Sequence, residues 1–247
     1  MITTVAKKNP QRIRKPARRL TLEAVVIIAS ILAAFALDRW WDMRRARQEQ
    51  QQVLAGLESE FRQAKVLLER YRDFQERVRV SVHSILTALR EADVNGASFV
   101  TTPDTALGLA YVPATARPSL GTLDGLLATA RLGVIRNAEL RNALASWAGV
   151  FDELAEEESE ARLFVMEQMD PIMRSRVNVA AFRTIFLKQL AGTLTPAEVS
   201  GASRIPVDNE VIGVFAARMF YLDHGIDEYG PVLEHVDLVL KLIEASR

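Results

Sequence analysis

Residues 54–71 read LAGLESEFRQAKVLLERY, and this stretch determines the fold that we expect. Its apolar side chains recur at alternating intervals of three and four residues, at Leu54, Leu57, Phe61, Ala64, Leu68 and Tyr71. This spacing places them on one face of an α-helix and is typical of a heptad seam between packed helices. The opposite face is charged, with Glu58 and Arg62 spaced as an i,i+4 pair. Such a seam needs a second helix to cover it.

The helical pattern extends beyond this stretch. Residues 42–92 contain no proline and only one glycine, so we expect one long helix there. A second long helix is predicted over residues 138–176, with Asn137 as its N-cap. Its apolar stripe consists of Leu140, Leu144, Trp147, Phe151 and Leu154. The two stripes have matching periods, so we predict that they pack together within one chain rather than between two copies.

Turn-forming residues separate the remaining elements. Residues 93–118 are rich in proline and Asn-Gly signals and are predicted to form a long loop. Shorter helices are predicted over residues 119–131, 180–191 and 209–246, the first ending at Gly133 and the last interrupted near Gly225 or Gly230. No segment alternates with period two for long enough to predict a sheet. We therefore expect an all-α fold, an N-terminal transmembrane helix followed by an elongated bundle of long, coiled-coil-like helices.

An apolar segment precedes the first long helix. Residues 20–37 read LTLEAVVIIASILAAFAL. A helix over residues 20–41 would be ~33 Å long, which is enough to cross a bilayer core. We predict a transmembrane anchor there, and its flanking and interfacial residues would be Arg18, Arg19, Glu23, Asp38, Trp40 and Trp41. The two tryptophans would lie at the interface, and Glu23 would pair with Arg19 four residues earlier.

Charge is distributed unevenly along the chain. The 31 basic side chains balance 31 acidic ones, but residues 1–19 hold seven basic residues and no acid. The rest of the chain is therefore acidic, which does not favour nucleic-acid binding. The positive-inside rule predicts that this basic leader is cytoplasmic and that the domain over residues 42–247 lies on the other side of the membrane, which for a bacterial inner membrane would be the periplasm. The lipid bilayer is thus the expected partner of residues 20–41.

Two alternatives to a retained anchor remain open. Ala34-Phe35-Ala36 resembles a signal-peptidase site, and cleavage there would release a soluble protein. Arg18-Arg19-Leu20 has a faint similarity to a twin-arginine signal. If the charge rule does not hold for this chain, the body would instead be a scaffold that faces the cytoplasm.

Two stretches resemble a bacterial family of single-span membrane proteins of unknown function. The first stretch comprises Glu23, Ile27, Ser30, Ile31, Ala34, Asp38 and Trp40, and the second comprises Thr122, Leu126, Thr129, Ala130, Leu132, Ile135, Asn137, Leu140, Arg141 and Leu144. Members of that family usually have glycine where this chain has Ser30 and Ala130. The resemblance implies a retained anchor and a helical body, and it implies no activity.

Motifs for catalysis or cofactor binding are absent from the sequence. The chain has no cysteine, which excludes disulfides and thiolate metal sites, and it lacks phosphate-binding, nucleophile-elbow and zinc-protease motifs. His224, Glu228 and His235 would share one face of an unbroken helix and are weak candidates for metal ligands. We expect no cofactor, and we expect a non-enzymatic domain that acts by contacts, as a scaffold, adaptor or sensor. The alternative is a metal-binding or hydrolytic enzyme that uses carboxylates and these histidines.

Overall fold

The computed structural model describes the backbone of residues 14–247, and it describes their side chains except for residues 14–22 and 24. Most of the predicted basic leader, and the side chains of Arg18 and Arg19, therefore lie outside the described residues. The chain divides into two compact units, residues 1–52 and residues 53–247, and each is described by itself.

The described chain is mostly helical, which confirms the all-α prediction. The helices are α1 (Arg14–Val94), α2 (Asp104–Ala110), α3 (Gly121–Ala128), α4 (Ala138–Phe164), α5 (Asp170–Arg174), α6 (Val179–Ala191), α7 (Pro196–Val199), α8 (Asn209–Asp227) and α9 (Tyr229–Ala245). A 3-10 turn at Leu132–Val134 precedes α4, and a π-helical segment at Val165–Met169 joins α4 to α5. Two strands, β1 (Phe99–Pro103) and β2 (Ala202–Pro206), form an antiparallel ribbon.

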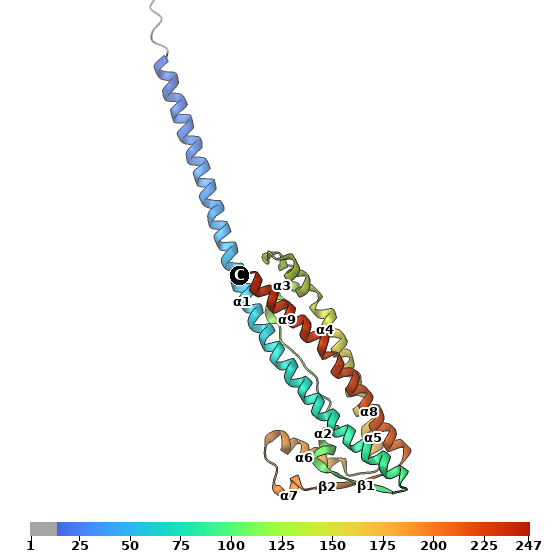
Figure 1. Ribbon diagram of the computed structural model, residues 1–247. Helices are drawn as coiled ribbons and strands as arrows, with labels where there is room; N and C mark the ends of the chain where they lie inside the picture. Colours follow the sequence, from blue (N-terminus) through green and yellow to red (C-terminus); the bar gives the residue numbers. More distant parts are fainter. Residues whose placement is uncertain (1–13) are drawn as a thin grey trace, which may run out of the picture. The chain divides into compact units, whose positions relative to one another are not determined.

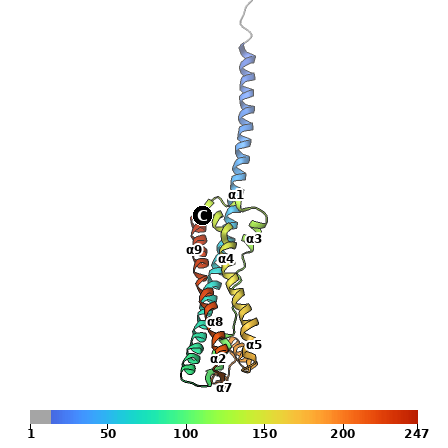
Figure 2. The ribbon, with the colours of Figure 1, turned by 90° about the vertical axis from the view of Figure 1, so that its right-hand side faces the viewer.

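The larger unit is a helical bundle. The part of α1 after residue 53 lies beside α4 and beside the pair formed by α8 and α9, as Figures 1 and 2 both show. Its buried side chains form two clusters, one around residues 54–68 of α1 with α3, α4 and α9, the other around residues 78–89 of α1 with α2, α6 and α8. The second cluster takes in the end of α4, so α4 contributes to both cores.

The heptad seam lies inside the first cluster. Leu54, Leu57, Phe61 and Leu68 are fully buried, and Tyr71 packs against them at the edge. From α4, the same cluster contains Leu140, Leu144, Trp147 and Leu154, with Phe151 partly buried. The Phe61 ring meets the Trp147 ring edge-on at 5.2 Å between centroids, and Trp147 stacks on Phe151. The seam of α1 is thus covered by α4 and α9 of the same chain.

The ribbon and α2 correct the prediction of a structureless loop over residues 93–118. Each strand has five residues, and the strands pair Phe99 with Pro206 and Pro103 with Ala202. A strand this short carries too few alternations to be recognised by its period. Its partner is also about 100 residues away in the sequence, where no local signal connects the two.

The turn after α3 also differs from the prediction. The helix ends at Ala128 rather than near Gly133, which lies in the 3-10 turn. Ala130 adopts a left-handed conformation with φ 52°, and the N–H groups of Ala130 and Arg131 donate to the carbonyls of Leu127 and Leu126. These two bonds form a Schellman cap, whose left-handed position favours glycine.

Other helix ends agree more closely with the sequence. The Asn137 side chain accepts a hydrogen bond from the N–H of Leu140, and Gly192 ends α6 in a left-handed conformation. The predicted helix over residues 138–176 is interrupted by the π-helical segment just before Pro171, and its last helical residue is Arg174. The predicted helix over residues 209–246 is divided at Glu228 into α8 and α9.

The smaller unit contains the apolar segment. Its large apolar side chains between Val25 and Met43 are all exposed, at 44–68% of their surface. Trp40 and Trp41 meet edge-on at 5.2 Å, the guanidinium of Arg44 lies over Trp40, and Glu23 and Asp38 are exposed. Among the described residues, no helix is both long and apolar enough to cross a membrane.

Phe61→Ala should lower the free energy of unfolding by about 3–5 kcal/mol, because it opens a cavity beside Trp147 in the core. Val66→Ala, at a side chain of the same helix that is 65% exposed, is the matched control and should change it by less than about 0.5 kcal/mol. Chemical denaturation at two protein concentrations gives both values. A folded Phe61→Ala protein of unchanged stability, or one that loses only self-association, would show that the seam is not internal core.

Ala130→Gly should stabilise the protein by up to about 1 kcal/mol. The left-handed conformation costs an alanine ~1–2 kcal/mol, and glycine removes that cost. The relief exceeds the ~0.4–1 kcal/mol by which glycine destabilises the protein through the greater entropy of its unfolded chain. Gly192→Ala is the reciprocal control, because Gly192 has φ 67° with open space around its Cα, and it should destabilise by a similar amount. An Ala130→Gly protein that melts below wild type, as Gly192→Ala should, would refute the assignment.

Candidate functional site

Residues 111–120, here called the strap, run in extended form from the end of α2 to the start of α3. In Figure 1 the strap is the thin trace that lies along the bundle between these two helices. Four of its residues, Tyr111, Ala114, Ala116 and Leu120, are buried. A buried segment without regular structure must find partners for its backbone N–H and C=O groups elsewhere.

Side chains from three helices supply those partners. The Gln75 side chain donates to the carbonyl of Ala114 at 3.1 Å, and Arg218 donates to the carbonyls of Ala110 and Val112 at 3.3 and 2.9 Å. Both carboxylate oxygens of Glu158 accept from the N–H of Ala116, at 3.1 and 2.9 Å. Just beyond the strap, Glu60 accepts from the N–H and hydroxyl of Thr122. The strap is therefore fastened to α1, α4 and α8.

Glu158 is only 2% exposed, although it belongs to a run of glutamates, at 156–158 and 160, of the kind that usually forms a solvated helix face. It also accepts a hydrogen bond of 2.6 Å from the hydroxyl of Tyr229 on α9. Burial raises the pKa of Glu158 above its ordinary value, and the hydrogen bonds from Tyr229 and Ala116 oppose that shift. This carboxylate connects α4, α9 and the strap.

Arg218 is the most deeply buried of the described charged side chains, at 1% exposure. Its partners are carbonyl oxygens rather than carboxylates, and its Nη1 has no hydrogen-bond partner among the described residues. Burial lowers the pKa of Arg218 to about 10, so the guanidinium stays charged at neutral pH. The partial negative charges of the Ala110 and Val112 carbonyl oxygens therefore stabilise this buried positive charge.

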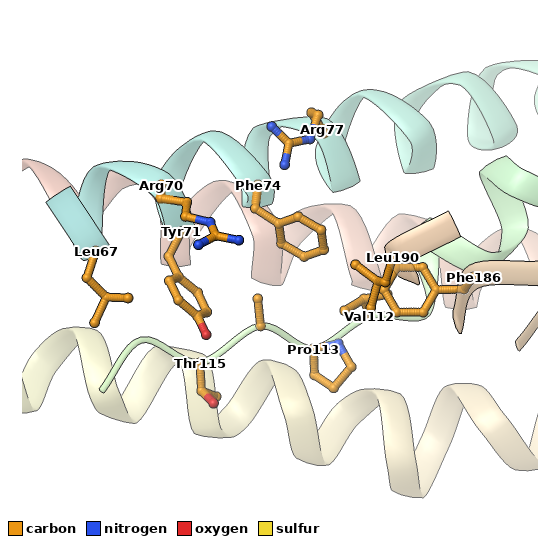
Figure 3. A pocket seen from close by; sticks show the side chains of 11 residues that line it. Leu67, Arg70, Tyr71, Phe74, Arg77, Val112, Pro113, Thr115, Phe186 and Leu190 are labelled. Atoms are coloured by element: carbon orange, nitrogen blue, oxygen red, sulfur yellow. The ribbon is translucent and has the colours of Figure 1, made fainter. Parts of the chain in front are cut away.

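A groove lies between α1 and the strap and encloses a cavity of about 500 Å³. The strap residues 112–115 form its floor, as Figure 3 shows. Its walls are Leu67, Arg70, Tyr71, Phe74 and Arg77 of α1 and Phe186 and Leu190 of α6. Helix α6 can lie close by because Gly108 of α2 has no side chain, since a Cβ there would be 2.7 Å from the carbonyl oxygen of Phe182.

Two cations lie on the rim of this groove. Arg70 and Arg77 are both exposed, and neither forms an ion pair with an acid among the described residues. The Arg77 guanidinium lies 5.4 Å from the centroid of the Phe74 ring. In Figure 3 the guanidinium groups of Arg70 and Arg77 extend toward Phe74 from opposite sides. By contrast, Arg62 on the same helix is paired with Glu58.

The groove continues along α1 in both directions. A depression of about 390 Å³ beside Val66 shares Leu67 and Arg70 with it. A second depression of about 500 Å³ beside Val80 shares Arg77. Val66 and Val80 are each 65% exposed. From Val66 to Val80, about four helical turns, one face of α1 therefore presents apolar side chains together with Arg70 and Arg77, and with Glu76 beside Val80.

The structure separates the three metal candidates. His224 and Glu228 lie at the end of α8, and His235 lies on α9, beyond the break between the helices. His224 packs on Phe220, and the Nε2 of His235 is 2.8 Å from the carbonyl oxygen of Ala143, to which it must donate. Among the described residues, no group of three histidines or carboxylates is placed to hold a metal ion.

No protein-family model, curated protein or solved structure matches this chain. The resemblance to the single-span family therefore remains a prediction from the two stretches that carry it.

Sequence reasoning missed Gln75, Glu158 and Arg218, although a signal was present. Each lies at a core position of its helix, Glu158 between Leu154 and Ala161, Arg218 between Phe215 and Leu222, and Gln75 between Leu68 and Val78. A polar residue in register with an apolar stripe indicates a buried hydrogen bond as well as a gap in the stripe.

Glu158 should make the stability of the protein depend on pH. Because its pKa is raised in the folded state, the native protein keeps this proton to a higher pH than the unfolded chain does. The free energy of unfolding should therefore fall as the pH rises from the ordinary value of 4.5 through the raised pKa. Glu158→Gln should abolish that component, whereas Glu156→Gln on the exposed face of α4 should keep it. Denaturation curves across this range would refute the assignment if the slopes of wild type and Glu158→Gln were identical.

Proposed function

We propose that this protein is a non-enzymatic helical domain, tethered to a membrane by residues 20–41, that binds a ligand or partner in the groove along α1. Its orientation would be that of the charge rule, with the leader in the cytoplasm and the body in the periplasm. The groove is the observation that carries the binding role, since it combines an apolar floor with two arginines that form no ion pair with an acid among the described residues. Concave sites with apolar walls and a few polar groups are typical of ligand binding.

The tether is supported by the surface of the apolar segment. Within the smaller unit, valine, isoleucine, leucine and phenylalanine side chains of residues 25–37 are exposed on every side of the helix. A helix that is apolar all round is stable only when something else buries it. Trp40, Trp41 and Arg44 follow this surface at its C-terminal end. Side chains of these types are enriched at membrane interfaces, so their position agrees with a membrane boundary there.

A binding role also agrees with how the polar side chains are used. Gln75, Glu158 and Arg218 are occupied with the strap, and the C-terminal histidines lie apart from one another. In this proposal Gln75, Glu158 and Arg218 keep the strap, and with it the floor of the groove, in place. An enzyme would instead require an acid, base or nucleophile within reach of a bound substrate.

The tether predicts that full-length protein stays in the membrane fraction after a carbonate wash. Ile28→Lys together with Leu32→Lys should release it, because two charges enter the apolar segment on one face. Val66→Lys with Val80→Lys is the matched control, since these valines are similarly exposed on the body. A C-terminal alkaline phosphatase fusion should be active in the same cells.

Three results would contradict this proposal. The first is wild-type protein that carbonate removes from the membrane fraction, and the second is a mature form that begins near Leu37. The third is an inactive phosphatase fusion together with fluorescence from a C-terminal fusion to a fluorescent protein that folds only in the cytoplasm. The second would show cleavage after Ala36, and the third would place the body in the cytoplasm.

A further inference from the structure

We infer that the groove binds a long-chain carboxylate, an amphiphile with one acyl chain and one anionic head. This inference rests on the proposed function of the groove as a binding site, and it specifies the ligand. The apolar walls would contact the acyl chain, and the arginine pair would bind the anionic head.

The apolar half of the site suits a single acyl chain. Leu67, Phe74, Val112, Pro113, Phe186 and Leu190 line a cavity of about 500 Å³, within the ~300–1,000 Å³ of small-molecule sites. Leu190 is 64% exposed at the α6 end, so apolar surface there is left for a ligand to cover. Because the adjoining depressions extend the groove along α1, its shape is long rather than round.

The polar half suits a carboxylate. Arg70 and Arg77 are seven residues apart on one face, and their guanidinium groups extend toward the same stretch of wall at Phe74 (Figure 3). A guanidinium matches a carboxylate with two parallel hydrogen bonds, and it is less strongly hydrated than an ammonium. With Arg77 held over the Phe74 ring, the head would lie at the mouth of the groove and the chain along the strap.

A docked helix fits these features less well. A helix with its side chains is about 10–12 Å across, so the cavity beside Phe74 would admit roughly one turn, and a longer helix would have to continue over the exposed surface at Val66 and Val80. The exposed acidic face of α4, with Asp152, Glu153, Glu156 and Glu160, would offer a second copy of the chain the right charge. The exposed apolar side chain of that face, Leu163, lies beyond Glu160 rather than between the acids, so the face does not place an apolar side chain and acids in the order that the groove presents.

The test uses the full chain in phosphatidylcholine nanodiscs and a hexadecanoic acid that carries a photoreactive diazirine. After irradiation, mass mapping should find label on residues 67–77, 112–115 and 186–190. Arg70→Gln with Arg77→Gln should reduce that labelling about tenfold, which corresponds to one order of magnitude in affinity. Arg90→Gln, an exposed arginine of α1 outside the groove, should leave it unchanged. Leu190→Glu, at an exposed side chain that the fold does not need, should also reduce it.

The probe set separates the possible occupants. The corresponding hexadecanol should label the groove weakly, and excess unlabelled lysophosphatidylglycerol should compete less well than unlabelled hexadecanoic acid. Equal labelling by the alcohol, better competition by the lysophospholipid, label confined to residues 25–43, or labelling that survives Arg70→Gln with Arg77→Gln would each overturn the inference. A retained protein that takes no label contradicts this inference alone, whereas a protein that washes off membranes but takes the label contradicts only the tether.

Discussion

The structure of the body depends on one constraint, the need to satisfy the backbone of an extended segment buried within a helical bundle. The two ends of the strap bond to neighbouring helices, Val112 N–H to the carbonyl of Leu109 and Asp124 N–H to the carbonyl of Leu120, but N–H and C=O groups between them depend on side chains. Glu158, Gln75 and Arg218 meet this need from α4, α1 and α8, and Tyr229 of α9 completes the ring of donors around Glu158. These contacts lie where the two apolar clusters meet, with Ala116 in one and Tyr111 in the other. The strap thus joins the two halves of the core.

The groove follows from the same arrangement. Where the strap passes α1, the space between them is lined by Tyr71, Phe74 and the strap itself. The hydrogen bonds that Gln75, Glu158 and Arg218 make to this backbone limit the positions that it can adopt. The same side chains that satisfy the strap would therefore keep the proposed binding surface in one shape. The arginines on the rim remain available because none of these contacts uses them.

The parts of the fold that could be predicted are the helices whose apolar side chains recur with a helical period. The heptad of residues 54–71 and the stripe of Leu140 to Leu154 identify two helices that do pack together, and the Asn137 cap marks the start of the second. The ribbon was not predictable, because five-residue strands separated by about 100 residues leave no periodic signal. Nor was the strap, since proline and turn residues predict only that a segment is not helical. The groove forms between such a segment and a helix, and its arginines look like any solvated pair in the sequence. Glu158 could have been identified, because it is in register with Leu154 and Ala161.

Amide hydrogen exchange at Ala116 tests the central claim most directly. An N–H that donates to a buried carboxylate inside the bundle should exchange as slowly as core amides of α4, although it belongs to no helix or strand. Exchange as fast as at the exposed turn around Gly96 would mean that the strap is not fastened by Glu158. The groove that it floors would then have no fixed shape.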